Sequence, residues 1–294
     1  MKARILDCKG AAARYFDWAA REIAAMKRKP RLATVLFRPE QNPASLRYRD
    51  LIVRDAERLG IVVEPHEAKE EEELLALVRR LNDDKAVTGA MLFYPLRAAV
   101  KDEDVMDLLS PHKDVEGLHS LNLGYLLKYK RFLDEARGVK CVVPATAKAV
   151  VKLLQSEPEL RLEGAFACVV NNSMRVGKPL GLMLENLGAT VVKCYDRTPR
   201  ALLEDCVRRA DVVVTAVPDP AFRVPAAWVK PGATLVDVSF EGNFDAKELM
   251  SVAGRLTVPE NRVGSMTRAM TFVNLVYCAK NAPLRRVAPR RRKS

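Results

Sequence analysis

The sequence of 294 residues lacks several features that would place it in a special class of protein. No stretch comes near the roughly 20 uninterrupted apolar residues that a membrane-spanning helix needs. Histidines, cysteines and carboxylates do not recur at a spacing typical of a metal site. The glycine pattern G-x-G-x-x-G of many dinucleotide-binding loops is missing, and so are internal repeats. We therefore expect no membrane partner and no bound metal.

The six cysteines are scattered and form no C-x-x-C pair. Several lie inside apolar segments that read as strands, which favours reduced core thiols in a cytoplasmic protein. The N-terminal segment 1–26 is amphipathic and contains acidic residues, so it resembles neither a secretory signal nor a typical transit peptide.

The net charge of +12 raises the question of a nucleic-acid partner. Six of the positive charges lie within residues 285–294, a basic tail that we expect to be disordered and to aid solubility or bind polyanions loosely. The remaining charge is spread thinly, without the aromatic side chains that stack on bases. We expect no specific nucleic-acid partner.

Hydrophobic residues make up 49% and charged residues 29% of a chain long enough for two domains. Predicted strands and helices alternate, which indicates an α/β fold with parallel sheets covered on both faces. Strands are expected at 31–37, 61–65, 87–94, 166–170, 189–195, 211–218 and 255–258, with a further segment at 228–240. Helices are expected at 11–28, 45–59, 67–82, 102–109, 142–155, 180–187, 200–209 and 266–280, and a loop at 110–124.

The stretch 166–196 combines a buried strand, a polar turn, a helix that ends near Gly188, and a second strand that ends on Asp196. A dinucleotide site needs these parts, because backbone N–H groups at a helix start bind the pyrophosphate and a carboxylate binds the ribose. Asn171 stands where the first glycine of the common motif would be. The candidate cofactor-binding residues are Asn171, Asn172, Ser173, Arg175, Val176, Gly177, Asp196, Arg197, Ala216 and Val217. A strand–helix–strand unit without a nucleotide remains the alternative.

Asp196 also predicts which dinucleotide is bound. A carboxylate at this point accepts hydrogen bonds from the adenosine ribose but repels a 2′-phosphate, so NAD is expected rather than NADP. Arg175, Lys193 and Arg197 are close in sequence and offer charges that a 2′-phosphate could meet instead.

Six blocks along the chain, in a fixed order, resemble one family, the methylenetetrahydrofolate dehydrogenase/cyclohydrolases. They are NPASLRYRDLIVRDAERLG, GAMLFYPLR, HKDVEGLHSLNLG, VVPATAKAVVKLL, VVNNSMRVGKPLGLMLENLGATV and VGSMTRAM. The resemblance implies an N-terminal α/β catalytic domain that binds folate, a C-terminal Rossmann-like parallel sheet that binds NAD, a cleft between them and a homodimer. The expected ranges are 1–145 for the folate domain, completed by the helix 266–280, and 146–265 for the NAD domain.

The departures from the family pattern are informative. Ile52 stands where the bifunctional enzymes have a lysine one helical turn after the motif tyrosine, and Phe93 replaces a supporting glutamine. Glu116 replaces an aspartate, and the turn 144–147 reads Pro-Ala-Thr-Ala. The loop that begins at Pro259 is one residue longer than usual and lacks its glycines. In these respects the chain resembles the monofunctional, NAD-dependent branch of the family.

The same resemblance assigns Tyr48 and Glu116 to the catalytic site, with Tyr48 lining the folate pocket and Glu116 holding the N–H edge of the pterin. The implied substrate-binding residues are Tyr48, Ile52, Phe93, Tyr94, Pro95, Glu116, Pro259, Gly264 and Thr267. Other interpretations stay open, since a helix tyrosine can simply pack against a loop and an acid beside a glycine can simply order a turn. His112 and His119 are interpreted as loop histidines.

The reactions that this family catalyses explain why the lysine and the glutamine could be lost together. Oxidation of 5,10-methylenetetrahydrofolate moves a hydride to the nicotinamide and leaves a methenyl cation, so positioning and electrostatics carry the step. Hydrolysis of that cation needs a general acid–base, which neither Ile52 nor Phe93 can supply. We therefore expect an NAD-dependent dehydrogenase on a folate substrate without cyclohydrolase activity. The alternatives are an inactive family member with a binding or scaffolding role, and a dehydrogenase acting on another substrate.

Overall fold

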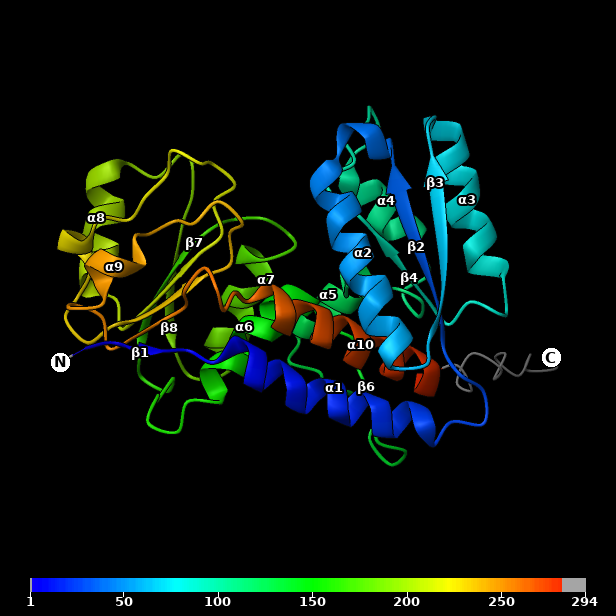
Figure 1. Ribbon diagram of the computed structural model, residues 1–294, viewed down its shortest axis with the longest axis horizontal. Coiled ribbons are helices and arrows are strands. Elements are labelled where there is room, and N and C mark those ends of the chain that lie inside the picture. The colour runs from blue at the N-terminus through cyan, green and yellow to red at the C-terminus, as the bar shows by residue number, and fades with distance from the viewer. Residues whose placement is uncertain (1, 282–294) are drawn as a thin grey trace, which may run out of the picture. The chain divides into compact units, whose positions relative to one another are not determined.

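The computed structural model describes residues 2–281 and divides into two compact units (Figure 1). One unit contains the chain up to Arg14 together with Thr146–Met270, and we call it the nucleotide unit. The other contains Tyr15–Ala145 and the described residues 271–281, and we call it the folate unit. The sequence led us to expect residues 1–145 in one domain, whereas in the structure the segment before Tyr15 groups with the nucleotide unit. The tail 285–294 lies outside the described residues.

The nucleotide unit is built on a six-stranded parallel sheet in the order β1-β11-β10-β9-β7-β8. The strands are β1 (Arg4–Ile5), β7 (Phe166–Val170), β8 (Thr190–Cys194), β9 (Val212–Thr215), β10 (Thr234–Asp237) and β11 (Arg255–Leu256). Every residue of β9 is buried, as expected for a strand covered on both faces. The strand order reverses at β7, because β8 lies on one side of it and β9 on the other.

Five helical segments belong wholly or mainly to the nucleotide unit. They are α6 (Ala145–Gln155), α7 (Gly177–Glu185), α8 (Arg200–Arg209), α9 (Ala246–Leu249) and a 3₁₀ turn, η2 (Ala226–Trp228). Trp228 and Val207 pack with Cys168, Val213 and Leu235 from the sheet in one apolar cluster. The predicted strand at 211–218 ends earlier, at Thr215, and Val217 bonds the side chain of Asn243 in place of a neighbouring strand.

The folate unit has a three-stranded parallel sheet in the order β3-β2-β4, formed by β2 (Arg31–Phe37), β3 (Val62–Ala68) and β4 (Gly89–Leu92). Alternate residues of β2 enter two different cores, with Val35 in one and Leu36 in the other, as the two-residue period of a strand requires. One core is completed by α3 (Glu71–Asp83) and α4 (Asp102–Leu108), and the other by α1 (Cys8–Ala24), α2 (Pro43–Arg58) and α10 (Gly264–Asn281). A short 3₁₀ turn, η1 (Pro39–Gln41), precedes α2.

Three parts of the structure differ from the sequence-based expectation. Helix α5 (Ser120–Leu127) occupies the second half of the segment 110–124 that was expected to be a loop. It begins there because the imidazole Nδ1 of His119 accepts a hydrogen bond from the backbone N–H of Leu121 at 2.9 Å, which caps the first turn. The antiparallel pair β5 (Phe132–Asp134) and β6 (Val139–Lys140) and the edge strand β1 were not expected at all.

All six cysteines lie within the described residues, where they are buried and none forms a disulfide. Between residues 2 and 281, no helix is both long and apolar enough to cross a membrane.

Candidate functional site

The turn after β7 is held together by the side chain of Asn171. Its amide oxygen accepts hydrogen bonds from the backbone N–H of Ser173 and of Gly177, both at 2.9 Å, and from the Ser173 hydroxyl at 2.8 Å. The Ser173 hydroxyl in turn accepts from the backbone N–H of Val176 at 3.1 Å. These bonds fold the segment into a tight loop that leads directly into α7. Asn171 thus stabilises with its side chain a turn that other dinucleotide-binding loops form with glycine.

Gly177, the first residue of α7, is needed for this loop to close. A Cβ atom placed on Gly177 would lie 2.0 Å from the carbonyl oxygen of Asn171 and 2.8 Å from the backbone nitrogen of Asn172. The first N–H groups of α7 bond within the loop, that of Gly177 to the Asn171 side chain at 2.9 Å and that of Lys178 to the carbonyl oxygen of Ser173 at 3.0 Å. A glycine at the start of a helix, placed so that two backbones approach closely after a strand of a parallel sheet, is typical of dinucleotide-binding loops. The residues present therefore fit a dinucleotide.

The loop is tied to the neighbouring strand at the point where the strand order reverses. The side-chain amide of Asn171 donates a hydrogen bond to the carbonyl oxygen of Ala216 at 2.7 Å, across the carboxyl ends of β7 and β9. Val217 is fixed in a similar way, since its N–H donates to the side chain of Asn243 at 2.9 Å and its carbonyl accepts from that side chain at 3.0 Å. Open α/β sheets bind their ligands at such a reversal. Sequence reasoning selected Ala216 and Val217 but missed the fully buried Asn243.

Asp196 and Arg197 lie just beyond the carboxyl end of β8, and both are exposed. The tip is a tight turn in which Tyr195 and Thr198 exchange hydrogen bonds of 2.9 Å. Because Val170 and Cys194 are in register, the Asn171 loop and the Asp196 tip start at the same edge of the sheet. Asn172 is exposed beside them, and Arg175 and Val176 are half-buried. The structure thus brings the predicted cofactor-binding residues to one edge.

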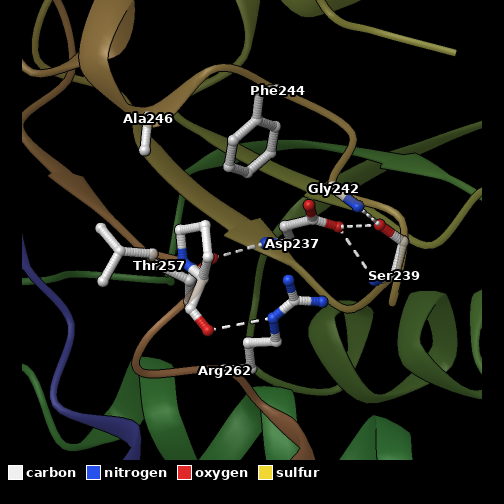
Figure 2. Close-up of a pocket in the computed structure, with 9 residues that line it drawn as sticks. Asp237, Ser239, Gly242, Phe244, Ala246, Thr257 and Arg262 are labelled. Carbon is white, nitrogen blue, oxygen red and sulfur yellow. Dashed lines mark hydrogen bonds between the residues drawn. The ribbon is translucent and has the colours of Figure 1, made fainter. Parts of the chain in front are cut away.

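A small pocket lies at the same edge, beyond β10 and β11 (Figure 2). Its polar floor is Asp237, whose carboxylate accepts hydrogen bonds from the Ser239 backbone and hydroxyl, the Thr215 hydroxyl and the Asn243 backbone. Because four donors bond this carboxylate, it stabilises the surrounding loops and so has a structural role. The pocket is also lined by Gly242, Phe244, Ala246, Thr257, Val258, Pro259 and Arg262.

Arg262, from the unusually long loop, is the cation of this pocket. Its Nε donates to the carbonyl oxygen of Pro259 at 3.0 Å, and another guanidinium nitrogen donates to the carbonyl oxygen of Phe240 (Figure 2 shows the first bond). The guanidinium carbon lies 5.3 Å from the centre of the Phe240 ring, and that ring is 72% exposed. Sequence reasoning listed Pro259 and missed this pair, although the altered loop was the available signal. Gly264 and Thr267 follow at the start of α10, where the Thr267 hydroxyl bonds its own helix through the carbonyl of Val263.

In the folate unit, Tyr48 lies on α2 with its ring edge-on to Phe93, the ring centres being 6.2 Å apart. Ile52, one turn further along α2, is completely buried in the core that Phe93 also enters. The two positions where the bifunctional pattern has a lysine and a glutamine are thus apolar and packed together. Tyr94 is buried on the opposite side of the sheet from Phe93, and Pro95 is exposed.

Glu116 lies in a loop whose backbone is fixed by Asp114. The Asp114 carboxylate accepts four hydrogen bonds, from the backbone N–H groups of Glu116, Gly117 and His119 and from the side chain of Asn122. Burial raises the pKa of the Asp114 carboxyl group, and the donors act against that rise. The half-buried Glu116 helps to line a small cavity with Tyr94, Met106 and Asp114.

The neighbouring charged residues of this loop have structural contacts. Lys113 is buried, and its Nζ donates to the carbonyl oxygens of Leu81 at 2.5 Å and Asp84 at 2.6 Å. His119 caps α5, as the interpretation of a loop histidine implies. Within residues 2–281, no group of three or more histidine, cysteine or carboxylate side chains is arranged to hold a metal ion.

Fold and site together define a two-domain α/β protein with a dinucleotide-binding parallel sheet. Profiles of the tetrahydrofolate dehydrogenase/cyclohydrolase family match both parts of the chain, the catalytic domain at residues 6–116 and the NAD(P)-binding domain at residues 144–283. The bifunctional protein FolD of Halalkalibacterium halodurans is 32% identical over 95% of this chain and 100% of its own length. The chain belongs to the tetrahydrofolate dehydrogenase/cyclohydrolase family, which confirms the expected resemblance and the two-domain α/β fold.

Solved structures agree with this assignment. A 5,10-methylenetetrahydrofolate dehydrogenase from the silkworm Bombyx mori is 31% identical, with a TM-score of 0.83 over 96% of this chain and 99% of that one. The NAD-dependent 5,10-methylenetetrahydrofolate dehydrogenase of Saccharomyces cerevisiae has the same fold, with a TM-score of 0.86 over 97% of this chain and 99% of that one, at 24% identity.

Proposed function

We propose that the protein oxidises 5,10-methylenetetrahydrofolate to 5,10-methenyltetrahydrofolate with NAD as hydride acceptor, and that it lacks cyclohydrolase activity. The observation that carries the proposal is the replacement of the proton-handling pair by Ile52 and Phe93, both buried in one apolar core. Hydrolysis of the methenyl cation needs a group that activates water and moves protons, and an isoleucine and a phenylalanine have no titratable atom.

Hydride transfer makes a smaller demand on the same residues. The carbon atom of the methylene bridge loses a hydride with its electron pair, and the methenyl product keeps a positive charge that resonance spreads over its two nitrogens. Bound NAD supplies the acceptor for that hydride. No proton has to leave, so the step depends on alignment and on electrostatic support. We assign the wall of the pocket to Tyr48 and the contact with the pterin N–H edge to the carboxylate of Glu116.

The choice of NAD rests on Asp196. Its carboxylate is exposed at the tip of β8, where the ribose of a dinucleotide is bound in this class of fold. A carboxylate accepts two hydrogen bonds from a ribose diol, whereas a 2′-phosphate would place a second anion against it.

The decisive experiment follows NADH formation with methylenetetrahydrofolate, and in parallel the decay of added methenyltetrahydrofolate. We expect NADH formation, and decay at the buffer rate. Ile52→Lys alone should not restore hydrolysis, because Phe93 cannot orient the new amine; Ile52→Lys with Phe93→Gln is the fairer test of whether the pair suffices. Hydrolysis by the wild type well above the buffer rate would refute a monofunctional enzyme. A folded protein that binds NAD but forms no NADH would favour the inactive alternative.

Cofactor choice is tested by Asp196→Asn, which keeps the shape and removes the charge. A charge-assisted hydrogen bond contributes about 1.5–3 kcal/mol, so the KM for NAD should rise roughly 10- to 100-fold while the KM for NADP stays level or falls. Glu163→Gln is the matched control, because Glu163 is an exposed carboxylate of the same unit that precedes β7 and so lies at the other edge of the sheet. A wild-type preference for NADP, or unchanged cofactor choice in Asp196→Asn, would contradict the assignment.

A further inference from the structure

Asn274 is a fully buried polar residue in the middle of α10. Its side-chain amide donates two hydrogen bonds, to the carbonyl oxygen of Val115 at 2.8 Å and to that of Val143 at 2.9 Å. An amide NH₂ group has two hydrogens, so a single side chain binds two loops that lie 28 residues apart in the sequence.

Both loops lead directly into the candidate catalytic region. Val115 precedes Glu116, and Val143 precedes the turn that begins at Pro144. The loops also touch one another, because the backbone N–H of Ala145 donates to the carbonyl oxygen of Glu116 at 3.1 Å. A Cβ atom placed on Gly117 would lie 2.4 Å from the carbonyl carbon of Val143, so the two backbones are in direct contact there. Asn274 therefore fixes a pair of loops that form one unit.

Other contacts hold the start of this loop to β4, since the backbone N–H of Ala90 donates to the carbonyl oxygen of Lys113 at 2.7 Å and that of Val115 donates to the carbonyl oxygen of Ala90 at 3.4 Å. The Asp114 carboxylate shapes the turn from Glu116 to His119, but it belongs to the same loop and moves with it. Cys278, one turn after Asn274 on α10, approaches the carbonyl oxygen of Asp114 with its Sγ at 4.0 Å, a weak interaction at best. The two bonds from Asn274 link α10 to Val115, which directly precedes Glu116, and to the neighbouring loop at Val143.

We infer that Asn274 is a positioning residue for Glu116. It holds the loop so that the Glu116 carboxylate can contact the folate. This inference rests on the proposed function, because it takes Glu116 to be the residue that binds the substrate. Without the amide, one buried and one partly buried carbonyl oxygen lose their donor, and the loop pair relaxes away from α10 to reach other partners. A displacement of about 1 Å at a catalytic group can cost roughly 100-fold in rate.

The chain offers a matched control on the same helix. Asn281 is also a buried asparagine of α10, and its side-chain amide donates to a carbonyl oxygen, that of Lys140, at 3.4 Å. Lys140 belongs to β6 and lies three residues before Val143, so this bond does not reach the loop of Glu116. A general loss of stability from deleting a buried amide should appear in Asn274→Leu and Asn281→Leu alike, whereas a positioning role should appear in the first alone.

The test measures steady-state kinetics for the full chain as wild type, Asn274→Leu and Asn281→Leu, at concentrations of folded protein set by a denaturation curve. For Asn274→Leu we expect kcat/KM for methylenetetrahydrofolate to fall 10- to 100-fold, with the KM for NAD within twofold of the wild type. Asn281→Leu should keep both values within twofold. Asn274→Ser, which retains one donor, should be intermediate, and it takes the place of the leucine variant if that one does not fold.

A double-mutant cycle with Glu116→Gln separates positioning from a merely structural effect. If Asn274 acts through Glu116, adding Asn274→Leu to Glu116→Gln should lower kcat/KM by less than threefold. Equal losses in the presence and absence of Glu116, or wild-type kinetics in Asn274→Leu, would overturn the inference. Absence of NADH formation by the wild type would instead refute the proposed function. Faster hydrogen exchange at the amides of Glu116 and Gly117 in Asn274→Leu then still tests the tether, and unchanged exchange would overturn it.

Discussion

Gly177→Ala is a sharp test of the phosphate-binding loop, because one methyl group has no room there. The new Cβ would lie 2.0 Å from the carbonyl oxygen of Asn171, where ordinary contacts begin near 3.4 Å. The obstructing atoms are backbone, so the loop or the first turn of α7 must move by about 1.4 Å. Overpacking of this kind typically costs about 1–3 kcal/mol.

The same displacement moves the loop backbone on which the pyrophosphate is expected to lie. If binding has to restore the original loop, that cost reappears as weaker affinity, roughly 5- to 150-fold at about 1.4 kcal/mol for each factor of ten. Titration with NADH measures the dissociation constant, and urea denaturation measures the free energy of unfolding. We expect the variant to be destabilised by about 2 kcal/mol and to bind NADH at least tenfold more weakly.

Gly181→Ala, one turn further along α7, is the matched control. A Cβ atom there would lie 3.3 Å from the Cδ of Lys193, which is the flexible part of a long side chain. Alanine also favours a helix interior over glycine by about 1 kcal/mol. This variant should therefore bind NADH as the wild type does, with equal or higher stability. Wild-type affinity and stability in Gly177→Ala would refute the close approach of Asn171 to α7 as the basis of the site.

Three further predictions concern other parts of the chain. Asn42→Ala removes the side-chain cap of α2 and should lower the free energy of unfolding in urea by about 1 kcal/mol; an unchanged value would contradict the cap. Lys230 holds the pKa of Asp211 below its usual range, so this carboxylate stabilises the fold above about pH 4 and less as the pH falls through its lowered pKa. Asp211→Asn should therefore be less stable than the wild type at pH 7 and nearly equal at pH 2, and an equal deficit at both pH values would count against the ion pair. Phe240→Ala removes the ring beside Arg262 at the edge expected for the nicotinamide half, so it should weaken binding of NAD but not of ADP-ribose; equal weakening of both would place the ring elsewhere.

Much of the fold could be predicted because its signals are local. The segment 166–196 has an apolar strand, a polar turn and a helix-ending glycine within one short stretch, and the structure forms these elements close to the expected limits. Helix α5 could not be predicted in the same way, since its apolar sequence is short and contains Gly124. Its start depends on a histidine cap, which differs from the usual serine, threonine, aspartate and asparagine.

The site could be predicted only in part, because several contacts depend on distant residues. Helical spacing placed Tyr48 and Ile52 on one face of α2, but the complete burial of Ile52 requires Phe272 and its neighbours from α10. Asn243 and Asn274 carry no sequence motif, and their importance follows from carbonyl groups that only the folded chain brings within reach. Residue type alone cannot reveal such partners.

The connectivity of the two units has a consequence for synthesis at the ribosome. The chain changes unit after Arg14, after Ala145 and again after Met270, so each unit is assembled from two separate pieces. β1 can enter its sheet only when β11 has emerged to lie between it and β10, and the folate unit lacks Phe272, Leu275 and Val276 until α10 is made. At about 5–20 residues per second, residues 15–145 wait roughly 7–27 s for that helix. A nascent chain that has emerged as far as Ala145 thus exposes the part of this apolar sheet face that α10 later covers.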